Sequence, residues 1–373
     1  MIGLSSVVDV YDNAELWDVL DNDAVLRLSR LGGQRGFRDS KALQKSTGIA
    51  RRRILKPQVT ELELGLRLGD RLQQQTGMRL SEFDQILLCH SHTDSKACQR
   101  LAKDLEDGFG LPPQAITAFN FGCAGYLKML TEAVSCFTET TRRIALLNIE
   151  TPELWHDASD RLFCGIVSAG ATATVLEADG GLPLSNVRSD DFLISPDLRP
   201  NPDPLFKRDL ADGFDFRGTA CRRTVMRMNA EPVFLNGIEL MLDSLRSALD
   251  FIDRQPGQRV VVLPHQPSGK LLKALIAAAA PEFPDVEVVN NLNDFGNTIS
   301  ATVPTMLSRL DRVLAENQLQ PLRPGDHLVL LAAGICMREI RNHMSAGYAT
   351  MQWNPQEFAA TTRLQPDAVV EPR

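Results

Sequence analysis

The sequence predicts an α/β protein made of two similar halves, and three observations indicate this class. Short apolar runs alternate with helix-length patterns, which is typical of parallel or mixed sheets covered by helices. The apolar runs are almost uninterrupted, as expected for strands buried on both faces. A segment rich in Pro, Asp and Gly, residues 180–220, separates two series of such elements.

The elements follow from these patterns in chain order. The apolar runs predict strands at 85–91, 143–150, 171–178, 258–265, 286–291 and 326–334. The stretches between them predict helices at 96–109, 123–140, 231–254, 268–280 and 299–317. The two series have a similar order of elements but no visible sequence repeat, which indicates a structural duplication. We therefore expect an N-terminal half over residues 1–180, a linker or excursion over 181–220 and a C-terminal half over 221–373.

Composition and charge narrow the class of protein. The 373 residues are 43% hydrophobic and 23% charged, with a formal net charge of −7. These values are ordinary for a globular protein, and the absence of a basic tail argues against a nucleic-acid partner. The N-terminus has no basic start, and the longest uncharged apolar run, residues 274–281, is too short to span a membrane. We therefore expect a cytoplasmic protein with no membrane partner.

Seven cysteines are present, with no paired spacing and no C-x-x-C motif. This pattern predicts reduced thiols and no structural metal site. Cys123 differs from the other six because it lies between Gly122 and Gly125, where a predicted strand gives way to a predicted helix. The positive end of a helix lowers the pKa of a nearby thiol and favours the nucleophilic thiolate. The alternative is a buried structural cysteine, which is the common role of a free thiol.

Two further residues occupy comparable boundaries. His265 ends the apolar run of "VVVLPHQPSG", and Asn297 follows Gly296 in "NDFGNTISATVP". The ends of strands in α/β folds are where functional sites gather. Taken singly, His265 could be a hydrogen-bonded structural residue and Asn297 a turn former. Cysteine, histidine and asparagine, in that order and each at an element boundary, favour one shared site.

These motifs resemble the β-ketoacyl-acyl-carrier-protein synthase III branch of the thiolase superfamily. "GCAG", "PHQ" and "GNT" are similar to its active-site motifs in order and spacing. "STGIARRRI", "MRMNAEPVFLNGIE" and "RPGDHLVLLAAGIC" resemble its N-terminal signature, the opening of its second half and its closing strand. The resemblance covers roughly residues 46–336.

The resemblance implies a thiolase-like duplicated fold of five αβαβα layers, normally a homodimer. It implies that an acyl thioester, on coenzyme A or an acyl carrier protein, acylates Cys123. His265 and Asn297 would then hold the carbonyl of a second thioester while its enolate forms and a Claisen condensation joins the two groups. The backbone N–H groups of Cys123 and Gly334 would hold the first oxyanion. No metal or redox cofactor is implied.

Some departures from the family favour a ketosynthase of specialised metabolism, such as polyketide synthesis, over a primary fatty-acid enzyme. The stretch "SKALQKSTGI" has no aromatic residue, where the family usually has a Trp shortly before T-G-I, and Pro267–Ser268 replaces the Ala-Asn usual after "PHQ". The second thioester could be malonyl, losing carbon dioxide, or β-ketoacyl, losing a proton. Asn297 favours carbon–carbon bond formation, since relatives that esterify alcohols or amines carry an acid there. Acyl transfer to an alcohol or amine is nevertheless an alternative, as are a cysteine hydrolase and an inactive partner subunit.

Two clusters of polar residues allow more than one interpretation of their role. Arg51, Arg52 and Arg53 form the densest basic cluster, which predicts either a solvated turn or a contact for the phosphates of coenzyme A or for an acidic carrier protein. His90 and His92 would share one face of a strand. No further metal ligand is evident beside them, so the sequence does not favour a metal site there.

Overall fold

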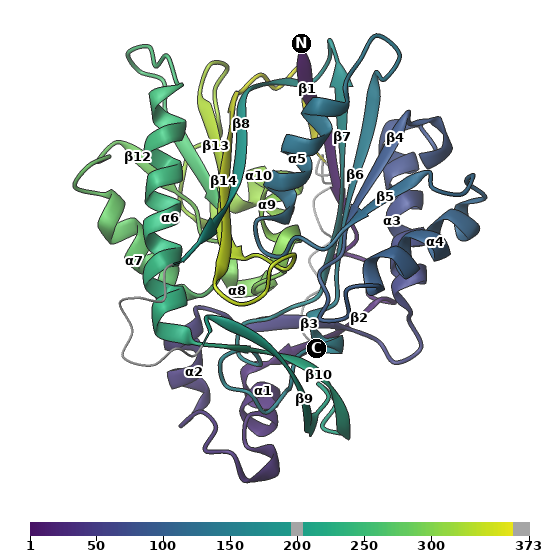
Figure 1. Cartoon of the computed structure of the whole chain (residues 1–373). Helices are drawn as coiled ribbons and strands as arrows, with labels where there is room; N and C mark the ends of the chain where they lie inside the picture. The colour runs from purple at the N-terminus through teal and green to yellow at the C-terminus, as the bar shows by residue number, and fades with distance from the viewer. Residues whose placement is uncertain (195–203, 361–373) are drawn as a thin grey trace, which may run out of the picture.

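The computed structural model describes residues 1–194 and 204–360, and it shows two half-sheets flanked by helices (Figure 1). In the first half-sheet the strands follow the spatial order β5-β4-β6-β7-β1. Their bounds are β1 Ile2–Asp9, β4 Gln85–Cys89, β5 Ile116–Phe119, β6 Arg143–Glu150 and β7 Gly170–Ala178. The predicted strands 85–91, 143–150 and 171–178 are confirmed to within two residues.

The second half-sheet repeats this topology, with the spatial order β12-β11-β13-β14-β8. Its strands are β8 Leu182–Leu193, β11 Val260–Pro264, β12 Val286–Val288, β13 His327–Ile335 and β14 His343–Gln352. In each half the three strands at the outer edge are parallel, and the other two are antiparallel to their neighbours. Equal strand order and direction in both halves is the structural duplication that the order of elements predicted.

Strand β8 also connects the two half-sheets. It pairs with β14 from Leu193 to Leu184 but meets β1 only through Pro183 and Leu182. The segment 181–220, which we expected to be a linker or excursion, therefore begins with a strand of the second half-sheet. Residues Phe206–Phe214 form β9, which pairs with β10, Ala220–Met228, in a separate ribbon. We accordingly propose that the second half begins at β8.

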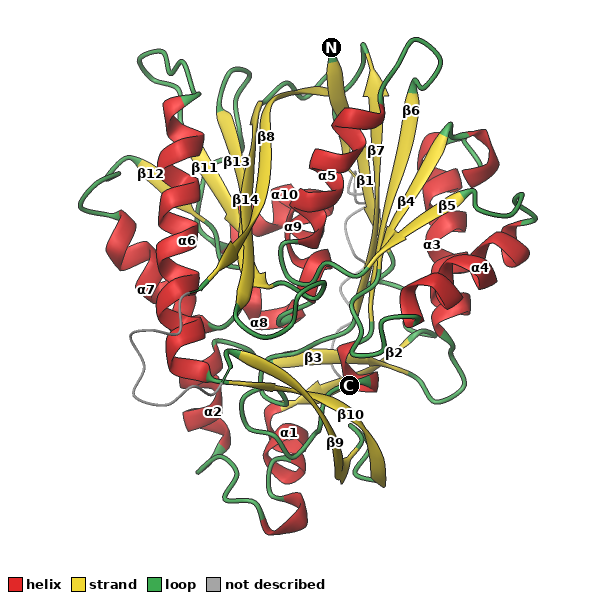
Figure 2. Ribbon diagram, in the orientation of Figure 1, coloured by secondary structure: helices red, strands yellow, loops and turns green. Residues whose placement is uncertain are grey.

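The helices make three layers around the two half-sheets, which gives the five αβαβα layers that the resemblance implied (Figure 2). The central layer contacts strands of both halves and holds α5 Gly125–Cys136, α9 Thr302–Ser308 and α10 Leu310–Glu316. The outer layers are α3 Glu61–Thr76 with α4 Ala97–Phe109, and α6 Ala230–Asp250 with α7 Gly269–Ala279. Among the described residues, no helix is both long and apolar enough to cross a membrane.

The duplication places α5 and α9 at equivalent positions, because each follows the outermost strand of its half-sheet in the chain. Their apolar side chains pack together in one core cluster, which includes Tyr126, Leu127, Val303 and Met306. The predicted helix 299–317 is divided in the structure into a 3-10 turn, Ile299–Ala301, followed by α9 and α10. This packing fixes the beginnings of α5 and α9 relative to each other.

A small group of elements covers one end of the two half-sheets, at the bottom of Figure 1. It includes the β9–β10 ribbon and the antiparallel pair β2–β3. The bounds of the remaining elements are α1 Asn22–Leu28, α2 Ser40–Thr47, α8 Leu292–Phe295, β2 Trp17–Asp21, β3 Arg51–Leu55 and β15 Ala359–Ala360.

Candidate active site

A cavity of about 560 Å³ opens where the two halves meet the covering elements. Its lining includes Cys123, His265, Asn297 and Gly334, so the structure brings all four predicted site positions together. Each comes from a different boundary: the start of α5, the end of β11, the turn before α9 and the end of β13. The rest of the wall is mainly apolar, as is common in sites for small molecules.

The turn before α5 holds Cys123 against the end of β13. Gly122 has a φ of 83°, in the left-handed region that favours glycine, and a side chain there would strike the carbonyl oxygen of Ile335. The N–H of Gly125 donates to the carbonyl of Gly122 at 2.8 Å and closes the turn. Gly122 is therefore needed for the close approach of two backbones beside the thiol.

The electrostatics of Cys123 differ from the expectation. Cys123 is partly exposed and faces the cavity, but the surrounding protein raises the pKa of its thiol to about 12, mainly through burial. The backbone N–H groups of Ile335 and of Cys123 itself act in the opposite direction. The predicted lowering of the pKa is wrong for the protein without substrate, because removal of water from around the sulfur outweighs these backbone dipoles. With this pKa, the Cys123 thiol is neutral at pH 7.

Gly334 lies directly against Cys123. A methyl group on Gly334 would be 2.9 Å from the Cys123 sulfur and closer still to its Cβ, so the position admits only glycine without displacement of the thiol. The N–H that acts on the sulfur belongs to the next residue, Ile335. The backbone N–H groups that act on the sulfur are thus those of Cys123 and Ile335, and the oxyanion role expected for the N–H groups of Cys123 and Gly334 stays a prediction.

His265 presents a neutral imidazole to the cavity. The backbone N–H of His265 donates to the carbonyl of Leu331 at 2.6 Å, which extends the pairing of β11 with β13 by one residue. Burial lowers the pKa of His265 to about 3. Within residues 1–194 and 204–360, neither ring nitrogen has a hydrogen-bond partner. Both nitrogens are therefore available to a bound molecule, one as a donor and one as an acceptor.

Asn297 has a fixed amide orientation. Its Oδ1 accepts from the N–H of Ile299 at 2.9 Å, whereas its Nδ2 makes only a long contact of 3.4 Å with the carbonyl of Pro267. The main chain of Asn297 is held on both sides, since its N–H donates to Ile166 and its carbonyl accepts from Ser168. With the oxygen engaged, the group that Asn297 can offer to the cavity is an N–H donor.

The predicted phosphate contacts at Arg52 and Arg53 are wrong. Arg52 is 1% exposed, and its guanidinium donates to the carbonyl of Gly165 and to side chains of Asn22 and Thr47.

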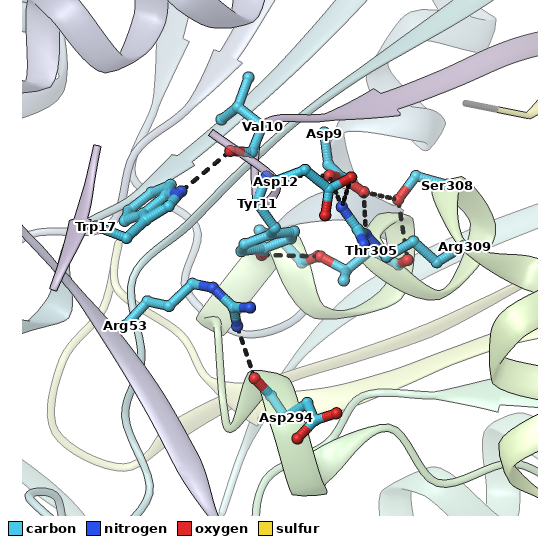
Figure 3. Close-up of polar contacts among 11 residues, drawn as sticks. Asp9, Val10, Tyr11, Asp12, Trp17, Arg53, Asp294, Thr305, Ser308 and Arg309 are labelled. Atoms are coloured by element: carbon cyan, nitrogen blue, oxygen red, sulfur yellow. Dashed lines mark hydrogen bonds and ion pairs between the residues drawn. The ribbon is translucent and has the colours of Figure 1, made fainter. Parts of the chain in front are cut away.

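Arg53 points into the protein, where it donates to the carbonyl of Asp294 at 2.6 Å (Figure 3). Its guanidinium also lies over the rings of Tyr11 and Phe295. Nearby, Arg309 forms a bidentate ion pair with Asp9 and ties the central helices to β1. Only Arg51 of the three arginines is exposed, and it is not among the residues that line the cavity. Arg52 and Arg53 thus join separate segments of the fold, a role that cannot be predicted from a run of like charges.

Two cationic side chains that were not predicted from the sequence also line the cavity. Arg161 and Lys270 are exposed, and among the described residues neither forms an ion pair. Arg161 lies over the ring of Phe37, 5.3 Å from its centroid, which limits its freedom. Lys270 directly follows the first residue of α7 and lies five residues beyond His265. The sequence signal for Lys270 was its closeness to the "PHQ" motif; Arg161 had no such signal.

The side chains of His90 and His92 both form hydrogen bonds with the main chain. Nδ1 of His90 lies 2.8 Å from the carbonyl of Ile149, and Nδ1 of His92 accepts from the N–H of Asp94 at 2.8 Å. Over the parts of the chain that the structure describes, no group of three or more His, Cys, Asp or Glu side chains could hold a metal ion.

The fold and the cavity define a class of protein: a thiolase-fold protein with a cysteine, a histidine and an asparagine at the junction of its halves. The family model for the C-terminal part of 3-oxoacyl-[acyl-carrier-protein] synthase III matches residues 253–338, which include His265, Asn297 and Gly334. The β-ketoacyl-[acyl-carrier-protein] synthase III of Paracoccus denitrificans is 28% identical over 296 residues, covering 78% of this chain and 86% of that protein. The chain thus resembles the synthase III proteins of the thiolase superfamily.

Solved structures show the same fold. The 3-oxoacyl-(acyl carrier protein) synthase III of Pseudomonas aeruginosa superposes with a TM-score of 0.69 at 20% identity, over 94% of this chain and 98% of that one. The priming β-ketosynthase of the R1128 polyketide pathway has a TM-score of 0.70 at 19% identity, over 95% and 97%. At these identities the likeness concerns the fold alone.

Proposed function

We propose that the protein is a condensing enzyme that joins a Cys123-bound acyl group to a second thioester by Claisen condensation. One observation carries this proposal. A thiol, an imidazole with two free nitrogens and an amide oriented as a donor line a single apolar cavity. The curated relative in Paracoccus denitrificans is named for the same class of reaction, which supports the proposal.

In the first step the Cys123 sulfur attacks the carbonyl carbon of an acyl thioester. The thiol proton passes to a nitrogen of His265, and the N–H groups of Cys123 and Ile335 stabilise the oxyanion. Collapse of this intermediate breaks the bond to the leaving thiolate, which takes the proton from His265. The acyl group is then attached to Cys123 and His265 is neutral again, ready to act as a donor.

In the second step a malonyl thioester places its carbonyl oxygen at the neutral His265 and at Nδ2 of Asn297. Loss of carbon dioxide leaves the electron pair of the broken bond in an enolate, whose oxygen both donors stabilise. The enolate carbon attacks the acyl carbon and displaces the Cys123 thiolate. A β-ketoacyl thioester would instead form its own enolate by passing a proton from the carbon between its two carbonyls to the acceptor nitrogen of His265. This chemistry uses two thioesters and needs no metal or redox cofactor.

The thioesters would reach Cys123 past Arg161 and Lys270. Both cations are exposed and line the cavity, so they can contact the phosphate of coenzyme A or of a carrier protein's phosphopantetheine arm. They take the role that the sequence reading assigned to Arg51, Arg52 and Arg53. We also propose, by analogy with the family, a homodimer in the cytoplasm that serves fatty-acid or polyketide synthesis, with specialised metabolism favoured by the sequence departures.

Acylation is tested by intact-mass measurement after the protein is mixed with a series of acyl-coenzyme A and acyl-carrier-protein donors. The wild type should gain the mass of the acyl group, and Cys123→Ala should not. Addition of a malonyl donor should then release carbon dioxide and give a product with a new carbon–carbon bond. A product with a C–O or C–N bond would instead indicate acyl transfer to an alcohol or amine, and acylation of Cys123→Ala would contradict the mechanism.

A further inference from the structure

The cavity wall contains two buried polar side chains that the proposed reaction does not use. Trp155 and His156 follow the 3-10 turn Pro152–Leu154 and are 2% and 1% exposed. In the described part of the chain, Nε1 of Trp155 and both ring nitrogens of His156 have no hydrogen-bond partner. Buried donors and acceptors are almost always satisfied in folded proteins, so three such atoms on one cavity wall require an explanation.

Packing holds these two side chains in place without satisfying them. The ring of His156 lies between Trp155 and Phe163, with both ring centroids 4.1 Å away. Burial lowers the pKa of His156 to about 3, with Arg223 and Arg227 acting in the same direction, so the imidazole is neutral. A neutral imidazole has one donor and one acceptor nitrogen, and Trp155 adds a second donor. These two cavity-lining residues therefore carry two N–H donors and one acceptor that no described group satisfies.

The surroundings show what kind of molecule could use these groups. Trp155 belongs to the same apolar cluster as Phe163, Val167 and Met226, and Cys123 packs against that cluster. All of these residues line the cavity. A saturated acyl chain on Cys123 would leave the three polar atoms unsatisfied, whereas an oxygen on the chain could pair with them.

We propose that Trp155 and His156 form a polar subsite that selects acyl thioesters whose chain carries a hydroxyl or keto oxygen. A hydroxyl can accept from Trp155 and donate to the acceptor nitrogen of His156, and a keto oxygen can accept from both donors. The inference rests on the proposed function, since it concerns the group that is transferred to Cys123. It specifies the substrate class: an oxygenated acyl chain rather than a saturated one.

The test compares rates of Cys123 acylation, measured by intact mass. The donors are acyl-coenzyme A pairs of equal chain length, one saturated and one with a hydroxyl or keto group at successive positions. The wild type should acylate at least about tenfold faster with one oxygenated chain than with its saturated counterpart, because a site built to hydrogen-bond a substrate rejects the analogue that lacks the group.

Two variants assign that preference to the subsite. Trp155→Phe removes one N–H, and His156→Phe removes both ring nitrogens but keeps an aromatic ring beside Phe163. Each should reduce the ratio of oxygenated to saturated rates towards one. Met228→Leu, an apolar change elsewhere on the cavity wall, should retain the ratio. Thermal melting identifies a variant that fails to fold, in which case the other variant decides.

The possible failures are distinguishable. Acylation of Cys123 at equal rates by both members of every pair would overturn the inference and leave the proposed function intact, and would mean that water alone satisfies these atoms. A preference that persists in both folded variants would also overturn it. No acylation of Cys123 by any donor would overturn the proposed function, and the subsite inference with it.

Discussion

The contact between Gly334 and Cys123 makes Gly334→Ala a sharp test of the active-site geometry. The new methyl group would lie 2.9 Å from the sulfur, whereas non-bonded heavy atoms prefer separations of roughly 3.5 to 4.0 Å. The methyl group would lie closer still to Cβ of Cys123, so Cys123 or the end of β13 would have to move by roughly 1 Å. Since a misplacement of about 1 Å can cost on the order of 100-fold in rate, we expect Cys123 acylation to slow by about 10- to 100-fold.

The loss of stability should be smaller than the loss of activity. Overpacking by one methyl group costs about 1–3 kcal/mol in the free energy of unfolding, which urea titration measures. Gly237→Ala in α6 is the matched control, because its new methyl group would meet nothing nearer than Leu271 at 3.6 Å and Met344 at 3.7 Å. That variant should acylate like the wild type and gain roughly 0.5–1 kcal/mol, since alanine is the better helix former.

Intact-mass time courses with an acyl-coenzyme A donor would measure the acylation rates of the wild type and both variants. If Gly334→Ala acylates within threefold of the wild type while remaining folded, Gly334 does not limit the position of the thiol. The inferred approach of β13 to the start of α5 would then be wrong. A similar loss of acylation in Gly237→Ala would point to general sensitivity of the fold to added methyl groups.

Three more predictions follow from the described contacts. Asn297→Asp replaces the N–H donor at Nδ2 by an oxygen, so release of carbon dioxide from a malonyl donor should fall by about 100- to 1000-fold. Acylation of Cys123 should change less than about threefold. Equal loss of both steps would contradict the role assigned to Asn297. Burial raises the pKa of Glu150 to about 8 from its ordinary 4.5, so the folded protein keeps a proton that the unfolded chain releases. The free energy of unfolding should therefore fall as the pH rises from 4.5 to 8, and urea titrations of Glu150→Gln should show a flatter dependence over that window; an unchanged slope would exclude Glu150 as its source. Arg161→Glu and Lys270→Glu should each raise the KM for coenzyme A donors about fivefold and weaken its salt dependence, whereas an unchanged KM in both would remove these cations from the thioester path.

The strands buried on both faces were the part of the fold that the sequence predicted best. β6 has the predicted bounds, β7 deviates by one residue at its start and β13 by one residue at each end, because uninterrupted apolar runs mark such strands. β1, β8 and β14 were missed, since each includes polar residues in a pattern that resembles a loop. α3 was missed although its caps, Thr60 and Gly77, are ordinary helix signals.

Some residues of the candidate site could likewise be predicted from the sequence, and others could not. Cys123, His265 and Asn297 were predictable because glycines, prolines and the ends of apolar runs mark element boundaries in a single sequence. Their meeting depends on the duplication, which places the starts of α5 and α9 face to face. Trp155 and His156 were not predicted as site residues, because their place on the cavity wall depends on partners from distant segments.

The chain itself determined which residues stand at the strand ends, since local backbone preferences and apolar runs are written in neighbouring residues. Only the tertiary structure decided their electrostatic state. Arg52 and Arg53 turn inward, and the pKa of the Cys123 thiol is raised where the helix start alone predicted a lowered one. The physical reason is that loss of water around a group is set by atoms that come from many parts of the sequence, and this loss outweighs the local dipoles.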